Sequence, residues 1–281
     1  MVAAKALIRL ALFGRPVEHS LSPVIHKGFA EQFDLGIEYQ RIDTGSGGFP
    51  GALEKFRLAG GSGCNITLPL KQDAWRLAAQ ASEEVSLAQA ANTLVYQPAS
   101  GWFAHNTDGA GLIADLVDDH GIELHDRRIL ILGAGGATAG ILGPLLRNKP
   151  REILLVNRSV ERARNLSERF GAAGNVSVSS WGDLSRQGVF DLVINATSLG
   201  HSGEVPPLKA SSFSAGGLCY DLNYFKASLP LKKHCQEMGQ RYIDGLGMLV
   251  GQAAKSFTIW TGKQPETGAV IEALRRDTGR P

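Results

Sequence analysis

Hydrophobic and polar positions along the chain follow two alternating periods. Short apolar runs, which are typical of buried strands, lie at residues 7–14, 37–43 and 62–67. The runs LVYQ and WFAH flank PASG, a pattern that predicts a hairpin. Apolar residues at helical spacing predict a helix over 23–33 and another that opens at Asp108 and ends at Gly121. Strands that alternate with helices in this way predict an α/β fold.

A second series of the same kind begins near residue 127. Strands are predicted at RRILIL, EILLV, VSVSS, FDLVINA and GLCYDL, with helices up to about Asn148 and over 160–170. Near Gly245 the chain enters a long helix whose buried stripe comprises Leu246, Leu249, Val250, Ala253, Phe257 and Trp260. Domain boundaries are therefore expected near residues 107 and 245.

Size and composition exclude several classes of protein. The 281 residues are enough for one or two domains with a large core. The net charge is +2, from 29 basic and 27 acidic residues, which gives no electrostatic case for nucleic acid or an anionic membrane. No apolar run approaches the ~20 residues that span a bilayer, and Lys5 and Arg9 interrupt the first one. We therefore expect the N-terminal run to be a buried strand and not a signal peptide.

The cysteines indicate a reducing compartment. Cys64, Cys219 and Cys235 are odd in number and far apart, and no CxxC occurs. This spacing predicts neither a disulfide framework nor a zinc site. The expected location is the cytoplasm, and no metal site is predicted.

A glycine-rich turn follows the strand that ends at Leu132. It comprises Gly133, Gly135, Gly136 and Gly140, and a helix begins within it. Glycines between a strand and a helix allow backbone N–H groups to approach a pyrophosphate, which the helix N-terminus stabilises. The strict pattern GxGxxG would place a glycine at 138, where Thr138 stands. The context still predicts a dinucleotide-binding turn.

The stretch VNRSVER, about twenty residues further on, indicates which dinucleotide binds. An NAD site shows an acidic residue here, which binds the ribose 2′-OH. This chain has Asn157, Arg158 and Ser159, with Arg162 one helical turn later. The planar donor fork of arginine matches a phosphate, and a cation at a helix N-terminus is unfavourable unless an anion binds there. The stretch therefore predicts NADP in preference to NAD.

Polar residues in the first segment are candidates for a substrate site, although each also has an ordinary structural role. Ser22, preceded by Ser20 and followed by Pro23, fits a helix N-cap. Asp108 could cap the next helix, and Lys71 could be a surface charge. Further polar candidates are Asn65, Thr67, Asn92, Asn106 and Thr107. Spacing alone does not show that Lys71 meets Asp108.

The order of these motifs resembles one known family. LSP, NITLPLK, AANT, NTDG, GAGGA, NRS, NATSLG and DGLGMLVGQ follow one another from about Phe13 to Ala273. This ordered set resembles the shikimate dehydrogenase family, which uses NADP to reduce 3-dehydroshikimate to shikimate in the biosynthesis of chorismate and aromatic amino acids. The resemblance implies two α/β domains around a cleft: residues 1–107 plus 246–281 bind substrate, and residues 108–245 form a Rossmann-type NADP-binding domain.

The resemblance also implies roles for individual residues. Lys71 and Asp108 would be the catalytic pair. The substrate-binding residues would be Ser20, Ser22, Asn65, Thr67, Lys71, Asn92, Asp108, Tyr224 and Gln252. The cofactor-binding residues would be Gly133, Ala134, Gly135, Gly136, Ala137, Asn157, Arg158, Ser159, Arg162, Leu222, Gly245, Met248 and Glu83. The implied partner is a small-molecule substrate, and the protein would be a monomer or a homodimer.

Three alternatives stay open at this point. A quinate/shikimate dehydrogenase with NAD use is disfavoured by Arg158, because such enzymes tend to carry an acid there. A relative of glutamyl-tRNA reductase would need a nucleophilic cysteine, whereas Cys64 is expected to be buried in a strand. A non-catalytic NADP-binding regulator would not need Lys71 and Asp108 together.

Overall fold

A computed structural model describes residues 7–278 and divides the chain into two compact units. The first unit runs to Gly111 and resumes at Val250, and the second comprises Leu112–Leu249. Both breaks fall inside helices, α5 (Asp108–Ile113) and α9 (Leu246–Thr261). The breaks predicted at 107/108 and 245/246 therefore lie four residues earlier, at the starts of these helices.

The first unit contains a mixed six-stranded sheet in the order β2-β1-β3-β5-β6-β4. Its strands are β1 (Ile8–Gly14), β2 (Ile37–Asp43), β3 (Gly61–Ile66), β4 (Gln80–Ala81), β5 (Thr93–Gln97) and β6 (Gly101–His105). β1 is parallel to β2 and β3, while β5 is antiparallel to β3 and β6. The hairpin predicted around PASG is thus β5–β6. The carboxyl ends of β1 and β3 lie side by side, with Phe13 opposite Ile66.

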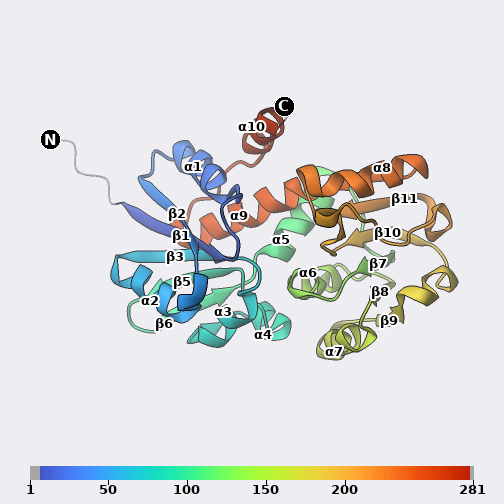
Figure 1. Ribbon diagram of the computed structural model, residues 1–281, viewed down its shortest axis with the longest axis horizontal. Helices are drawn as coiled ribbons and strands as arrows, with labels where there is room; N and C mark the ends of the chain where they lie inside the picture. The colour runs from blue at the N-terminus through green and yellow to red at the C-terminus, as the bar shows by residue number, and fades with distance from the viewer. Residues whose placement is uncertain (1–6, 279–281) are drawn as a thin grey trace. The chain divides into compact units, whose positions relative to one another are not determined.

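Most helices of this unit lie against the sheet, while the last one packs on the first (Figure 1). These helices are α1 (Ser22–Gln32), α2 (Phe49–Leu58), α3 (Lys71–Leu77), α4 (Glu83–Ala88), the greater part of α9, and α10 (Gly268–Thr278). Phe13 packs edge-on against Phe49 and Phe56 of α2. On α9, the fully buried Phe257 packs against Phe29 of α1. The apolar stripe predicted for α9 is therefore a helix-packing surface.

The second unit contains an all-parallel sheet in the order β12-β11-β10-β7-β8-β9 (Figure 1). Its strands are β7 (Arg128–Leu132), β8 (Glu152–Asn157), β9 (Val176–Ser180), β10 (Phe190–Asn195), β11 (Phe213–Asp221) and β12 (Arg241–Asp244). Read from β9, this is the strand order 3-2-1-4-5-6 of a Rossmann fold, as predicted. The order reverses between β7 and β10, and ligands of such sheets bind at the carboxyl ends beside that point.

The helices of the second unit are α6 (Gly136–Arg147), α7 (Val160–Phe170) and α8 (Leu229–Glu237). Strands buried on both faces need near-continuous apolar sequence, and β7 supplies it with Ile129, Leu130, Ile131 and Leu132, all without exposed surface. After α5 the chain continues as a π-helical segment, Ala114–Asp119, which the sequence did not predict. The sequence also did not predict α2, α3, α4, α8, α10, β4 and β12.

One local prediction was wrong. Ser22 was expected to be the N-cap of α1, but the N-cap is Leu21, and Ser22 is the first helical residue. No side chain caps the start of α1. The hydroxyl of Ser22 therefore has no capping role.

Candidate functional site

An ion pair joins Lys71 to Asp108. Lys71 is the first residue of α3 and Asp108 the first of α5, so two helix starts bring them together. Only 14% of the Lys71 side chain and 8% of the Asp108 side chain are exposed. The Lys71 Nζ atom donates to Asp108 Oδ2, while Asp108 Oδ1 accepts from Asn92 Nδ2 at 2.7 Å. Both carboxylate oxygens are thus engaged, which fixes the direction in which Asp108 holds the ammonium.

Asn92 connects this pair to α9. Its amide Nδ2 donates to Thr107 Oγ1 at 2.9 Å and to Gln252 Oε1 at 3.1 Å, as well as to Asp108. Its Oδ1 accepts from the Thr107 backbone N–H at 2.8 Å. Asn92, Thr107 and Asp108 are all buried. Buried polar groups are stable only when hydrogen-bonded, so these contacts specify one arrangement.

Asn65 forms a second centre of hydrogen bonds. Its Oδ1 accepts from the Tyr39 hydroxyl at 2.8 Å and lies 3.2 Å from His26 Nε2. Its Nδ2 donates to Ser256 Oγ and Thr93 Oγ1, each at 3.1 Å. Every polar atom of the Asn65 side chain is therefore engaged, and its amide has a single sensible orientation.

Ser256 joins the two centres. Its hydroxyl lies 2.7 Å from Thr93 Oγ1 and 3.1 Å from Thr107 Oγ1, in addition to its bond with Asn65. The result is one continuous polar network, made of Tyr39, His26, Asn65, Thr93, Ser256, Thr107, Asn92, Gln252, Asp108 and Lys71. We call it the polar network. It spans β2, α1, β3, β5, α9 and the starts of α5 and α3.

Four members of the polar network were not predicted: Tyr39, His26, Thr93 and Ser256. A signal existed for Ser256, because it follows Gln252 by one helical turn and so lies on the same side of α9. No comparable signal marked Tyr39, since tyrosine is an ordinary strand residue.

His26 is a neutral base in the interior. It has no exposed surface and stacks on Tyr39 with ring centroids 4.6 Å apart. Burial lowers the pKa of His26 to about 3, although its hydrogen bond to Asn65 opposes this shift. Burial also raises the pKa of Tyr39 well above its usual range. Both groups are therefore neutral at physiological pH, and His26 donates from Nε2 to the Asn65 carbonyl oxygen.

The two predicted serines lie together before and at the start of α1. Ser20 Oγ donates to Ser22 Oγ at 3.1 Å, and the Ser22 backbone N–H donates to Ser20 Oγ at 3.2 Å. The Arg41 guanidinium donates to the Ser20 carbonyl at 2.6 Å and holds the loop. Thr67 follows β3, and its hydroxyl makes no hydrogen bond to the residues that the structure describes; its methyl group faces Gly14.

The second unit carries a hollow of about 180 Å³ at the carboxyl ends of β7, β8 and β10. It is lined by Gly133, Ala134, Gly135, Asn157, Arg158, Arg162, Trp181, Ala196, Thr197, Ser198 and Leu199. Gly133 has φ +105°, and a Cβ atom there would lie 2.9 Å from the Ala196 carbonyl oxygen. A Cβ atom at Gly135 would meet open space. The first glycine thus permits the turn, and the second leaves room for a ligand beside the backbone.

Thr138 replaces the third glycine of the strict pattern without closing this hollow. Its hydroxyl is buried and donates to the Gly133 carbonyl at 2.9 Å. The side chain therefore braces the turn. Gly136 and Ala137 form the first turn of α6, whose backbone N–H groups are the anion-binding end of the helix.

Arg158 and Arg162 line the hollow and are exposed. Neither forms an ion pair with a residue in the described range 7–278. Asn157 Nδ2 donates to the Ser159 carbonyl at 2.9 Å, and Ser159 is the N-cap of α7 without a side-chain cap bond. Two guanidinium groups and an unsatisfied helix start thus converge on one place, which fits a phosphate. This lining fits the 2′-phosphate of NADP next to the glycine turn.

The remaining predicted cofactor residues of the second unit are Leu222 and Gly245 on loops and Met248 on α9, and the predicted substrate contact Tyr224 also lies in this unit. A Cβ atom at Gly245 would lie 2.5 Å from the Leu222 carbonyl oxygen, so only glycine allows these loops to approach. Met248 is buried in the first turn of α9, and Tyr224 follows β11 beside Phe225. Glu83 instead begins α4 of the first unit, where a carboxylate suits the helix N-terminus.

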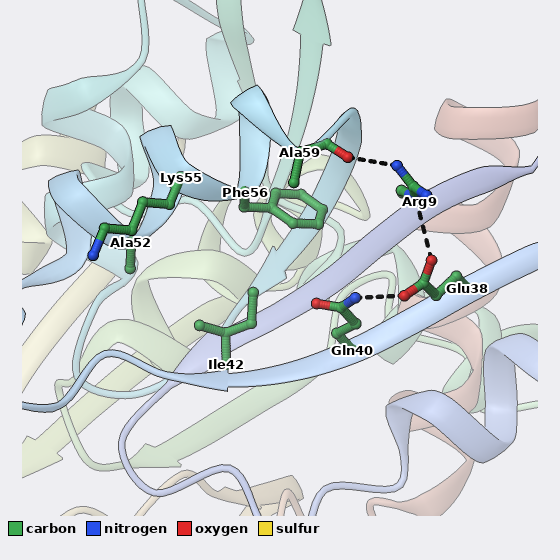
Figure 2. A pocket seen from close by; sticks show the side chains of 8 residues that line it. All are labelled: Arg9, Glu38, Gln40, Ile42, Ala52, Lys55, Phe56 and Ala59. Atoms are coloured by element: carbon green, nitrogen blue, oxygen red, sulfur yellow. Dashed lines mark hydrogen bonds and ion pairs between the residues drawn. The ribbon is translucent and has the colours of Figure 1, made fainter.

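A larger hollow of about 500 Å³ lies between β2 and α2 of the first unit and contains none of the predicted residues. Figure 2 shows Arg9 between the Glu38 carboxylate and the Ala59 carbonyl, with Phe56 and Ile42 on its walls. The Arg9 guanidinium donates to both, at 3.2 and 2.6 Å. Arg9 and Glu38 of this hollow thus pair with each other.

Neither a metal-binding group nor a membrane-spanning helix is found in the described part of the chain. Within residues 7–278, no group of three or more His, Cys, Asp or Glu side chains could hold a metal ion. None of the described helices is long and apolar enough to cross a bilayer.

The parallel sheet, its glycine turn and the paired lysine and aspartate define the class: an NADP-dependent oxidoreductase of Rossmann type. Residues 12–94 match a family model described as the shikimate dehydrogenase substrate binding domain. Residues 115–202 match the shikimate/quinate 5-dehydrogenase model, and residues 245–275 match the shikimate 5′-dehydrogenase C-terminal domain.

Individual relatives agree. The shikimate dehydrogenase (NADP(+)) of Alkalilimnicola ehrlichii is 44% identical over 268 residues, 95% of this chain and 98% of that protein. Among solved structures, an Ael1 enzyme from Pseudomonas putida has a TM-score of 0.88 at 39% identity, covering 95% of this chain and 98% of the other. Shikimate 5-dehydrogenase of Thermus thermophilus, in complex with NADP(H) and shikimate, has a TM-score of 0.81 at 32% identity, covering 96% and 99%. The chain belongs to the shikimate dehydrogenase family.

Proposed function

We propose that this protein catalyses the reversible, NADP-dependent reduction of 3-dehydroshikimate to shikimate. The observation that carries the proposal is the nearly buried Lys71–Asp108 pair, held at one end of the polar network. A nearly buried ion pair is a costly way to stabilise a fold. A proton donor that must stay charged and oriented explains its presence.

The chemistry assigns a role to each member of the pair. The Lys71 ammonium donates a proton to the substrate oxygen that becomes a hydroxyl, and the amine takes the proton back in the oxidative direction. The Asp108 carboxylate stabilises the ammonium and orients it, and Asn92 orients Asp108 in turn. NADPH, when bound, supplies the hydride.

Substrate recognition falls to the other polar groups of the first unit. The paired hydroxyls of Ser20 and Ser22 suit the substrate carboxylate. Asn65, Thr67, Asn92 and Gln252 carry the amide and hydroxyl groups that would bind the ring hydroxyls, with Tyr224 as a further contact. Polar groups fixed in this way reject a substrate that leaves them unpaired.

The proposal extends to the arrangement of the chain. The first unit, with α9, serves as the substrate domain and the second as the NADP domain. Glu83 lies in the first unit and stays a proposed contact to the cofactor. The three cysteines are free thiols, which suits a cytoplasmic enzyme. Its partners are small molecules, and it acts as a monomer or homodimer.

A matrix of initial rates tests the proposal: shikimate and quinate, each with NADP and with NAD, followed by the absorbance of the reduced cofactor. We expect the highest kcat/KM for shikimate with NADP. Absence of turnover with all four combinations would contradict the proposal. A higher kcat/KM for quinate with NAD would instead place the protein with the quinate dehydrogenases.

A further inference from the structure

Asp221, the last residue of β11, has no exposed surface and no assigned role in the reaction. Its Oδ1 accepts from Asn195 Nδ2 at 2.9 Å, from the Asn223 backbone N–H at 3.0 Å and from Asn223 Nδ2 at 2.8 Å. Its Oδ2 accepts from the Tyr242 hydroxyl at 3.2 Å. A fully buried carboxylate is costly unless donors surround it, and here four hydrogen bonds do so.

These contacts close into a ring. Asn195 Oδ1 accepts from the Thr197 backbone N–H at 3.1 Å and from Thr197 Oγ1 at 2.7 Å. Asn223 Nδ2, which donates to Asp221, also donates to the Thr197 carbonyl at 3.0 Å. The ring of Asp221, Asn195, Thr197 and Asn223 thus joins the loop after β10 to the loop after β11. We call it the Asp221 ring.

The Asp221 ring adjoins the cofactor hollow and the loops beyond it. Thr197 lines the hollow, and the carbonyl of its neighbour Ala196 faces Gly133 of the glycine turn. On the other side, the Gly245 backbone N–H donates to the Asn223 carbonyl at 3.0 Å. Three loops therefore depend on the same ring: 196–199, 222–224 and the start of α9. They include Leu222, which the resemblance implies is a cofactor contact beside the nicotinamide.

We propose that Asp221 is a positioning residue that holds these three loops in the conformation that receives the nicotinamide half of NADP. This inference rests on the proposed function, because it assumes that NADP binds in the hollow. The ring stands at the ends of β10 and β11, and β7 separates these strands from β8, after which Arg158 and Arg162 begin the next βα unit. Only Thr197 of the ring lines the hollow that these arginines share. Arg158 and Arg162 would bind the other end of the cofactor. Loss of the ring should therefore weaken one half of the cofactor site and spare the other.

The test compares two ligands by calorimetric titration at pH 8. NADP contains both halves of the cofactor, whereas adenosine 2′,5′-bisphosphate contains only the half that Arg158 and Arg162 would bind. For Asp221→Asn, we expect the Kd of NADP to rise about tenfold, as for a lost charged hydrogen bond, and that of the bisphosphate by less than about twofold. Asn223→Ala removes the donor shared by Asp221 and Thr197 and should act in the same direction.

Tyr242→Phe is the matched control, because it removes the bond to the other carboxylate oxygen and leaves the ring closed. It should not change the ratio of the two Kd values. Equal weakening of both ligands in the ring variants, or no weakening, would overturn the inference. If Asp221→Asn does not fold, as judged by circular dichroism, the two titrations of Asn223→Ala test the inference instead. Failure of the wild type to bind NADP would overturn the proposed function itself.

Discussion

The polar groups of the two units are prepared for their ligands in opposite ways. In the first unit, the members of the polar network hydrogen-bond to one another, so that Asn65, Asn92 and Asp108 are already fixed. In the second, Arg158 and Arg162 extend from the start of α7 without an ion pair to any described residue. One site is organised before its ligand binds, and the other offers charge to a ligand that supplies the counter-ion.

The difference follows from what each ligand demands. Recognition of several hydroxyls requires donors and acceptors that point in defined directions. Side chains that hydrogen-bond to one another already point in fixed directions, so they lose little mobility when the substrate binds. A phosphate accepts hydrogen bonds from many directions, so flexible guanidinium groups suffice. The two sites should therefore respond differently to substitution.

The largest expected effect concerns Lys71. Lys71→Met keeps the aliphatic stem and removes the proton donor, so kcat for shikimate should fall ~10²–10⁴-fold. The KM for shikimate should change little, because Asn65, Asn92 and the serines stay in place. Steady-state kinetics with NADP measure both constants.

Lys27→Met is the control for Lys71→Met, because the Lys27 side chain is 80% exposed and pairs only with Glu31. It should leave kcat and KM unchanged. Turnover by Lys71→Met at the wild-type rate would refute the role of Lys71 as proton donor.

The next effect concerns the second unit. Arg158→Ala removes a guanidinium group from the hollow, so the KM for NADP should rise about 10–100-fold, as for a lost charged hydrogen bond. The KM for NAD should hardly change, because NAD lacks the 2′-phosphate.

Arg164→Ala is the matched control for Arg158→Ala, since Arg164 is exposed on α7, the helix that follows Arg158, but does not line the hollow. Equal effects of Arg158→Ala on NADP and NAD would mean that the residue does not discriminate between the cofactors.

The two sites also differ in how far the sequence predicted them. The glycine turn and VNRSVER are contiguous stretches whose geometry follows from local structure, so Gly133 and Arg158 could be placed in advance. The polar network could not be deduced, because Tyr39, Thr93 and Ser256 meet only through the strand order β2-β1-β3-β5 and the packing of α9. The sequence offered Asn65, Asn92 and Thr107, and the resemblance added Gln252. It did not offer the residues that hydrogen-bond Asn65, namely Tyr39, His26, Thr93 and Ser256.

The predicted fold class is confirmed, and the sequence missed only individual elements of it. Most strands of the second sheet were found because strands buried on both faces have continuous apolar runs, whereas the short strands β4 and β12 were missed. Helix α8, with two lysines and a histidine in nine residues, has too few apolar positions to stand out. For Ser22 the sequence left a capping role open beside substrate binding, because serine before proline is a common cap pattern, yet the helix begins one residue earlier.

The smallest expected effect is on the pH dependence of stability, which should differ between the two units. His26 of the polar network has its pKa lowered to about 3, whereas burial raises the pKa of Asp221 in the second unit to about 6. A base whose pKa is depressed by folding binds fewer protons when folded. Stability is therefore lost as the pH falls below about 6.5, the unfolded value of histidine. An acid whose pKa is raised binds more protons when folded, so its contribution is present at low pH and is lost as the pH rises through about 6.

Substitution of each residue should reveal these opposite dependences of the free energy of unfolding on pH. Between pH 7 and pH 5, His26→Phe should gain ~2 kcal/mol in free energy of unfolding relative to the wild type, because the variant no longer has a buried base that unfolding protonates. Over the same range, Asp221→Asn should lose ~1 kcal/mol relative to the wild type. Urea unfolding at pH 5, 6 and 7 measures both differences, and each variant is the control for the other because the signs are opposite. If both variants changed in the same direction relative to the wild type, the buried histidine and the buried aspartate would not govern how the stability of their units depends on pH.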